Sequence, residues 1–332
     1  MHMRDELKNK MDKYIKECVL YYDLPGLIIG VGFCNSNYKY EGAAGVRNIE
    51  TKEVLTPDAI FHTCSTTKLF TCMAIFMLIE ENKLELDDKI VDLIGNDYSD
   101  RFETKNAAYI SDARYKDVTI RHILTHTSGL FESEFLYHPN DKRFVYADPE
   151  YDVLGEVIEK VTGIPFDEYI YGKILEPLNM HNSEISVRQR ENLVSAHSKN
   201  SDNEIVISPY FDYSISRAPS SGLTSTVADM AKWAEEVLVK KTLIKRDTYD
   251  IILREYVETP DNQHMCMSWF KRIQSGYTLY GHFGSDIGYR TGFWICPELN
   301  LYFTVLSNIT RTPINKICSE VFDIIRETSI TL

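Results

Sequence analysis

The chain has 332 residues, of which 44% are hydrophobic, and its formal net charge is −13 at pH 7. A chain of this length and hydrophobic content can bury a large core, either as one mixed domain or as two closely joined halves. The acidic surplus argues against nucleic acid as a partner, because binding phosphates requires Lys and Arg in excess on one face.

The sequence gives no sign of a membrane span or of export. No apolar stretch approaches the roughly 20 residues that a spanning helix needs, and residues 1–16 form a charged helical pattern. We therefore expect a cytoplasmic protein, unless a leader was removed ahead of Met1-His2-Met3. Seven scattered cysteines without a CxxC pair predict buried, reduced thiols and argue against disulfides or a zinc site.

Hydrophobic periodicity and turn residues predict strands at both ends of the chain and helices between them. The first third contains, in order, a helix over 5–22, strands over 26–34 and 38–46, a short strand near Ile60, an apolar helix from Ser65 and a helix over 87–94. The middle contains helices over 118–124, 150–161, 166–175, 226–238 and 246–255. The last third contains strands over 268–272, 277–283, 289–296 and 301–307 and a helix over 313–327.

This order, without βαβ alternation, predicts an α+β fold. Its simplest form is one antiparallel sheet built from both termini and flanked by helices, with an inserted, mainly helical region. We expect a single unit over 1–332, with a sheet subdomain at about 1–62 and 265–332 and a helical subdomain at about 63–264. A cleft between them is the expected ligand site, walled by the polar segments 95–117, 131–145 and 186–214.

Ser65 and Lys68 open the apolar run 69–79. In a helix, side chains three residues apart lie on one face, so the hydroxyl and the amine would touch. A serine needs a neighbour that takes its proton, and burial near a helix N-terminus is expected to lower the pKa of Lys68 enough for that task. The pair predicts acyl transfer, and the alternative is a serine N-cap followed by a surface lysine.

The same spacing occurs twice more, but in segments that look like strands, where such side chains point to opposite faces. These copies begin at Ser36 and Ser268. His122 and His126 are four residues apart, as in some metal sites, but no third ligand is evident. We expect no metal and no organic cofactor.

Two other segments extend the serine motif into a recognisable set. They are Tyr146-Ala147-Asp148 ahead of a helix and Gly281-His282-Phe283-Gly284-Ser285 on a late strand. With Ser65 to Lys68 they resemble the penicillin-binding-protein and class C β-lactamase superfamily of serine hydrolases, which includes esterases and D-peptidases. Further landmarks of that superfamily cover most of the chain, at 124–130, 151–155, 158–163, 175–180 and 221–226.

The resemblance implies a catalytic role for four residues. Ser65 would be the acylated nucleophile, and Lys68 would lower the barrier to its proton loss. Tyr146 would act as general base, or as acid toward the leaving group. The backbone amides of Ser65 and Ser285 would form the oxyanion hole.

Four neighbouring residues are the implied substrate contacts. His282 would touch a substrate carboxylate or polarise the Tyr146 region, Phe283 would make the cleft apolar, and Gly284 would let the backbone approach the substrate. Asp148 departs from the superfamily, which usually has asparagine there. An ionised aspartate only accepts hydrogen bonds, and its charge would raise the pKa of Lys68 if the two met.

The function that follows is hydrolysis through an acyl-enzyme on Ser65. The expected substrate is a small ester or a D-amino-acid peptide or amide, and the oligomeric state is left open. The alternative within enzymes is a β-lactamase or penicillin-binding DD-peptidase. The alternative of another class is a binding or assembly module that kept the fold and lost the chemistry.

Overall fold

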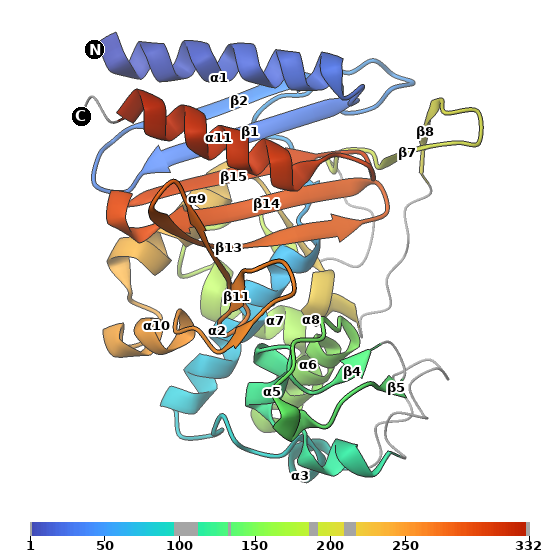
Figure 1. Ribbon diagram of the computed structural model, residues 1–332, viewed down its shortest axis with the longest axis vertical. Coiled ribbons are helices and arrows are strands. Elements are labelled where there is room, and N and C mark those ends of the chain that lie inside the picture. Colours follow the sequence, from blue (N-terminus) through green and yellow to red (C-terminus); the bar gives the residue numbers. More distant parts are fainter. Residues whose placement is uncertain (1, 96–111, 132–133, 186–191, 209–216, 330–332) are drawn as a thin grey trace.

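Eight strands form one antiparallel sheet to which both ends of the chain contribute (Figure 1). Its spatial order is β10-β11-β12-β13-β14-β15-β1-β2, so β1 from the start of the chain pairs with β15 from its end. This confirms the expected sheet. The strands are β1 (Gly26–Phe33), β2 (Lys39–Gly45), β10 (Val257–Glu258), β11 (His264–Met265), β12 (Phe270–Gln274), β13 (Tyr277–Asp286), β14 (Tyr289–Cys296) and β15 (Leu301–Ser307). The structure, a computed structural model, describes residues 2–95, 112–131, 134–185, 192–208 and 217–329.

The two terminal helices, α1 (His2–Tyr21) and α11 (Ile314–Ser329), cover one face of this sheet (Figure 1). Successive side chains of a strand point to opposite faces. Accordingly Leu27 and Ile29 of β1 pack in the cluster that contains both terminal helices, whereas Ile28 between them packs against Val227 on the other face. The sheet is thus buried on both sides, between terminal helices and the helical region.

The helical region surrounds α2, whose residues are buried over most of its length. Apolar side chains around the whole helix explain this burial, because no face of α2 suits water. The helices and helical turns of this region are η1 (Cys64–Thr66), α2 (Thr67–Glu80), α3 (Ile90–Ile94), η3 (Ala113–Asp117), α5 (Ile120–Leu124), η4 (Pro139–Asp141), α6 (Pro149–Thr162), α7 (Phe166–Ile170), η5 (Tyr171–Leu175), α8 (Ala218–Ser221), α9 (Val227–Glu235), η7 (Glu236–Lys240) and α10 (Arg246–Ile252).

Several short elements differ from the sequence prediction. The helix expected from Ser65 begins as the 3₁₀ turn η1, and the one expected over 246–255 ends at Ile252. The short strand expected near Ile60 is β3, but the other strands of two or three residues were not predicted, because they are too short to show a period. They are β3 (Phe61–His62), β4 (Leu130–Phe131), β5 (Glu134–Phe135), β6 (Glu184–Ile185), β7 (His197–Lys199), β8 (Ile205–Ile207) and β9 (Leu223–Ser225), and η8 (Pro297–Leu299) joins β14 to β15.

All seven cysteines carry free thiols, and six of them are buried. The burial of most of them agrees with the sequence prediction. Within the described ranges, no helix combines the length and the apolar content that crossing a membrane requires.

Candidate active site

Ser65 lies in η1, the turn that leads into α2. Cys64 before it has a φ of +51°, in the left-handed region that is costly for residues other than glycine. Two hydrogen bonds hold this conformation: Cys64 N–H donates to His62 Nδ1 at 2.8 Å, and the Thr67 hydroxyl donates to the Cys64 carbonyl at 2.7 Å. The nucleophile candidate therefore sits on a strained but well-supported turn.

The Lys68 ammonium lies directly behind Ser65 and is fully buried. It donates to Ser65 Oγ at 3.3 Å, to Asp148 Oδ1 at 2.5 Å and to the Ser220 carbonyl at 2.9 Å. A lysine ammonium has three N–H donors and no lone pair, so three acceptors match its charged form. The structure thus brings Ser65 and Lys68 together, and it adds Asp148 to the same cluster.

The lowered pKa expected for Lys68 is wrong. Burial alone would lower the pKa of Lys68, but the Asp148 carboxylate and the Tyr146 phenol together raise it above its ordinary value. Conversely, burial would raise the pKa of Asp148, whereas the Lys68 charge and hydrogen bond bring it below its ordinary value. The expectation from desolvation and the helix end failed because the condition stated for Asp148 is met: its carboxylate contacts the amine and raises the pKa of Lys68. The resting pair is an ammonium and a carboxylate.

Tyr146 lies over the same ammonium, with Lys68 Nζ 5.3 Å from the centre of its ring. Burial raises the pKa of Tyr146 to about 12, against the opposing effect of the Lys68 charge and of hydrogen bonds with Ser65 and Lys68. The phenol therefore keeps its proton at neutral pH. Of the two groups that contact the Lys68 ammonium, the Asp148 carboxylate is therefore the one that rests in its basic form.

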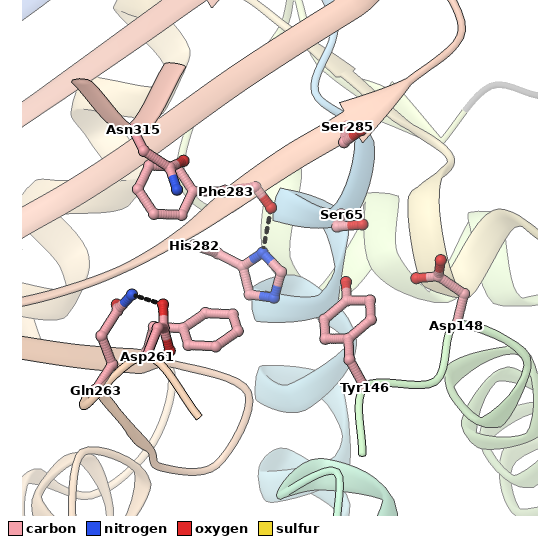
Figure 2. A pocket seen from close by; sticks show the side chains of 10 residues that line it. Ser65, Tyr146, Asp148, Asp261, Gln263, His282, Phe283, Ser285 and Asn315 are labelled. Atoms are coloured by element: carbon pink, nitrogen blue, oxygen red, sulfur yellow. Dashed lines mark hydrogen bonds between the residues drawn. The ribbon is translucent and has the colours of Figure 1, made fainter. Parts of the chain in front are cut away.

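A cavity of about 410 Å³ opens above this cluster (Figure 2). Six of the eight expected site residues line it, and the two that do not are Lys68 and Gly284. The expected residues are Ser65, Tyr146, Asp148, His282, Phe283 and Ser285, and the unexpected ones are Asp261, Gln263, Phe270 and Asn315. Much of the predicted cleft walls 95–117 and 186–214 lies outside the described residues.

Gly284 lets strand β13 pass close to the serine turn. A Cβ added at this position would lie 2.1 Å from Thr291 Oγ1, 2.6 Å from the Thr63 carbonyl oxygen and 2.9 Å from Cys64 Cβ. These three neighbours are atoms of the protein itself. Glycine is therefore required here because β13 packs closely against η1 and β14, whereas the sequence suggested an approach to the substrate. Ser285, the next residue, is exposed at the pocket.

His282 and Phe283 lie on the same strand but differ in their surroundings. His282 is buried, and its Nδ1 is 2.5 Å from the Phe283 carbonyl oxygen. The Phe283 ring packs edge-on against Trp294, with ring centroids 4.9 Å apart. Phe283 thus supplies part of an apolar wall, in keeping with the sequence expectation.

The four unexpected residues reach the pocket from distant elements. Asp261 and Gln263 lie in the turn between β10 and β11, Phe270 begins β12 and Asn315 lies in the first turn of α11. The only sequence signal was the turn-forming stretch 259–262, where Asn262 has a φ of +58°. That signal predicts a turn but not where the turn points.

Neither histidine of the possible metal pair is placed as a ligand. His122 closes a capping box with Thr119 at the start of α5, and His126 stacks on Tyr146. In the part of the chain that the structure describes, no group of three or more His, Cys, Asp or Glu residues could hold a metal ion.

Comparison with known proteins places the chain in a family. The model of the family described as Beta-lactamase matches residues 11–317. The chain belongs to the beta-lactamase family. This membership confirms the resemblance carried by the Ser65, Tyr146 and His282 motifs, and with it the β-lactamase/transpeptidase-like fold.

Within the beta-lactamase family, the relatives are distant in sequence. "Protein flp" of Staphylococcus aureus (strain N315) is 21% identical over 355 residues, which cover 95% of this chain and 66% of that protein. The octameric penicillin-binding protein homologue from Pyrococcus abyssi superimposes with a TM-score of 0.83 at 24% identity, covering 96% of this chain and 77% of that one. The D-amino acid amidase from Ochrobactrum anthropi SV3, complexed with D-phenylalanine, has a TM-score of 0.78 at 14% identity, covering 99% and 100%. These structures share the fold.

Proposed function

We propose that this member of the beta-lactamase family hydrolyses small esters or the amides and peptides of D-amino acids through an acyl-enzyme on Ser65. The observation that carries the proposal is the 3.3 Å contact between Lys68 Nζ and Ser65 Oγ at the floor of the pocket. A volume of about 410 Å³ suits a small substrate. The D-amino acid amidase of similar fold supports the choice of amides.

Acylation requires a route for the Ser65 proton, because every N–H of Lys68 is already donated. Lys68 first passes a proton to Asp148, 2.5 Å away, and then takes the proton of Ser65 as Oγ attacks the substrate carbonyl carbon. The bond to the leaving group breaks as the Tyr146 phenol gives that group its proton. Lys68 then reprotonates Tyr146 and recovers its own proton from Asp148, so the net change is the transfer of one proton from Ser65 to the leaving alcohol or amine.

Deacylation reverses this sequence with water as the nucleophile. The water proton follows the same Lys68 and Asp148 pair, and Ser65 Oγ regains a proton as the free acid departs. In both steps negative charge develops on the carbonyl oxygen. The backbone amides of Ser65 and Ser285 are the proposed donors to that oxygen, and fixed donors of this kind stabilise it without reorganisation.

Two alternatives remain distinct from this proposal. A β-lactamase or DD-peptidase would use the same nucleophile, but Asp148 cannot donate a hydrogen bond to a substrate amide as asparagine can. A non-catalytic binding module would have no use for a buried lysine beside a serine. Burial of such a cation is costly, and its retention favours chemistry.

A substrate panel tests the proposal. Initial rates with a p-nitrophenyl acyl ester, D- and L-alanine p-nitroanilide and nitrocefin are compared for wild type, Ser65→Ala and Ser36→Ala. We expect turnover of the ester and the D-anilide, a loss of about a thousandfold or more in Ser65→Ala, and no loss in Ser36→Ala, which removes an exposed serine of the same motif. Nitrocefin turnover far above the others would favour the β-lactamase, and no turnover of any substrate would favour the binding module.

A further inference from the structure

The charged groups that line the pocket are all acidic. They are the carboxylates of Asp148 and Asp261, and no Lys or Arg belongs to the lining that the described residues provide. Lys68 lies beneath the surface with its three N–H groups already donated. Arg217 acts on Asp148 through space but is not part of the lining.

His282 adds an unused acceptor to this lining. A carbonyl oxygen can only accept, so the bond to Phe283 places the proton on Nδ1 and leaves a lone pair on Nε2. The residue is 1% exposed, and Nε2 has no hydrogen-bond partner. Figure 2 shows the Nε2 edge of the ring directed toward Tyr146, whose ring centre is 6.1 Å away. Burial and the nearby Lys68 charge lower the pKa of His282 to about 3, so the ring stays neutral.

Gln263 likewise has an acceptor atom without a hydrogen-bond partner in the described part of the chain. Its amide nitrogen donates to Asp261 Oδ2 at 2.5 Å, and its carbonyl oxygen has no partner. The pocket lining therefore holds two carboxylates, an imidazole lone pair and an amide oxygen, all of which accept hydrogen bonds. The carboxylates already accept from Lys68, Thr259 and Gln263. His282 Nε2 and Gln263 Oε1, by contrast, have no donor among the described residues. A ligand carboxylate would meet like charge at Asp148, and the Lys68 charge beneath the lining is already paired with that carboxylate.

We propose that the Ser65 site selects substrates whose acyl group carries a free ammonium group next to the reacting carbonyl, bound by Asp148 and facing His282. The inference rests on the proposed hydrolase function and deepens it. Lys68 bridges Ser65 Oγ and Asp148 Oδ1, so the carboxylate lies two hydrogen bonds from the nucleophile. An α-amino group is two covalent bonds from the carbonyl carbon, so a substrate whose ammonium binds Asp148 would present that carbon on the Ser65 side of the pocket.

Three anilides that differ in charge test the proposal. D-Alanine p-nitroanilide carries the ammonium at neutral pH, D-lactic acid p-nitroanilide is a neutral analogue of the same size, and N-succinyl-D-alanine p-nitroanilide carries a carboxylate. We expect kcat/KM to be about tenfold or more higher for the ammonium substrate than for the neutral one, and lowest for the anion. The preference should decline above about pH 8, where an α-amino group loses its proton.

Variants separate this inference from the proposed function. Asp148→Asn should bring the ratio between ammonium and neutral substrates close to one, whatever its effect on the absolute rates. Glu168→Gln removes an exposed carboxylate on α7 outside the pocket and should leave the ratio unchanged. A wild-type ratio of one or less, with esters still hydrolysed and Ser65 acylated, overturns the inference alone. No turnover and no covalent label on Ser65 overturns the proposed function and the inference with it.

Discussion

The imidazole of His126 stacks on the phenol of Tyr146, with ring centroids 4.3 Å apart and planes 28° from parallel. The same residue also holds the backbone on both sides of Tyr146. The His126 carbonyl accepts the N–H of Val145 at 2.8 Å, and His126 Nδ1 accepts the N–H of Ala147 at 3.2 Å. His126 is therefore a positioning residue for the phenol, a role that its spacing from His122 in the sequence did not indicate.

Replacing His126 by alanine removes the stack and one of the two acceptors, so we expect kcat to fall about ten- to a hundredfold. His126→Asn should recover part of the activity, because asparagine has an acceptor oxygen and tolerates the φ of +52° found here. In a Tyr146→Phe background, His126→Ala should add little. Steady-state kinetics of the three variants and the double variant give the test, and a fully additive double variant would contradict the positioning role.

Asp148→Asn should change the pH dependence of kcat/KM for a neutral ester. In the wild type, Asp148 stays ionised down to acidic pH, because its pKa lies below its ordinary value. It can therefore accept the proton of Lys68 over that whole range. Without that carboxylate, Lys68 must be neutral before it can take a proton, so the acidic limb of the profile should move up by about two pH units or more. The proton route would be contradicted by a wild-type kcat/KM that rises only at high pH and by an acidic limb that moves to lower pH in Asp148→Asn.

The sequence was most successful where the relevant neighbours are local. Strands β14 and β15 agree with their predicted ranges, because each is rich in aromatic and aliphatic residues and bounded by turn residues. The contact between Ser65 and Lys68 follows from helical spacing in the same way. Both depend on a few consecutive residues.

Long-range contacts explain the failures. Lys68 and Asp148 are 80 residues apart, and no local pattern shows that the carboxylate will reach the amine. Asp261 and Asn315 reach the pocket from the turn before β11 and from α11. The boundary between the two subdomains near 63 and 265 stays a prediction, because the sheet and the helical region pack together along their length (Figure 1).

Gly284→Ala should impair both folding and activity. Its Cβ would lie 2.1 Å from Thr291 Oγ1 and 2.6 Å from the Thr63 carbonyl, so β13 would have to move away from the serine turn. Overpacking of this kind costs about 1–3 kcal/mol in the free energy of unfolding. Gly172→Ala is the matched control, because an added Cβ there meets nothing within 4 Å. Denaturant unfolding compares the two, and equal stability of both variants would contradict the close approach.

Glu150→Gln should stabilise the protein near neutral pH. Burial raises the pKa of Glu150 to about 8 from an ordinary 4.5, with the nearby Ser128 hydroxyl opposing the shift. The folded state therefore keeps a proton that the unfolded chain has released, and this group lowers stability as the pH rises from about 4.5 to 8. We expect the variant to gain at least about 1 kcal/mol in the free energy of unfolding at pH 8 relative to its effect at pH 4. A gain that does not change with pH would contradict the buried, protonated carboxyl.

Intact-mass measurement after exposure to a fluorophosphonate tests most directly whether Ser65 is the nucleophile. The account predicts one adduct, located on Ser65 by peptide mapping, absent in Ser65→Ala, present in Ser36→Ala, and formed more slowly in Lys68→Ala. An adduct on another serine, or an unmodified wild-type protein under conditions that label other serine hydrolases, would contradict it.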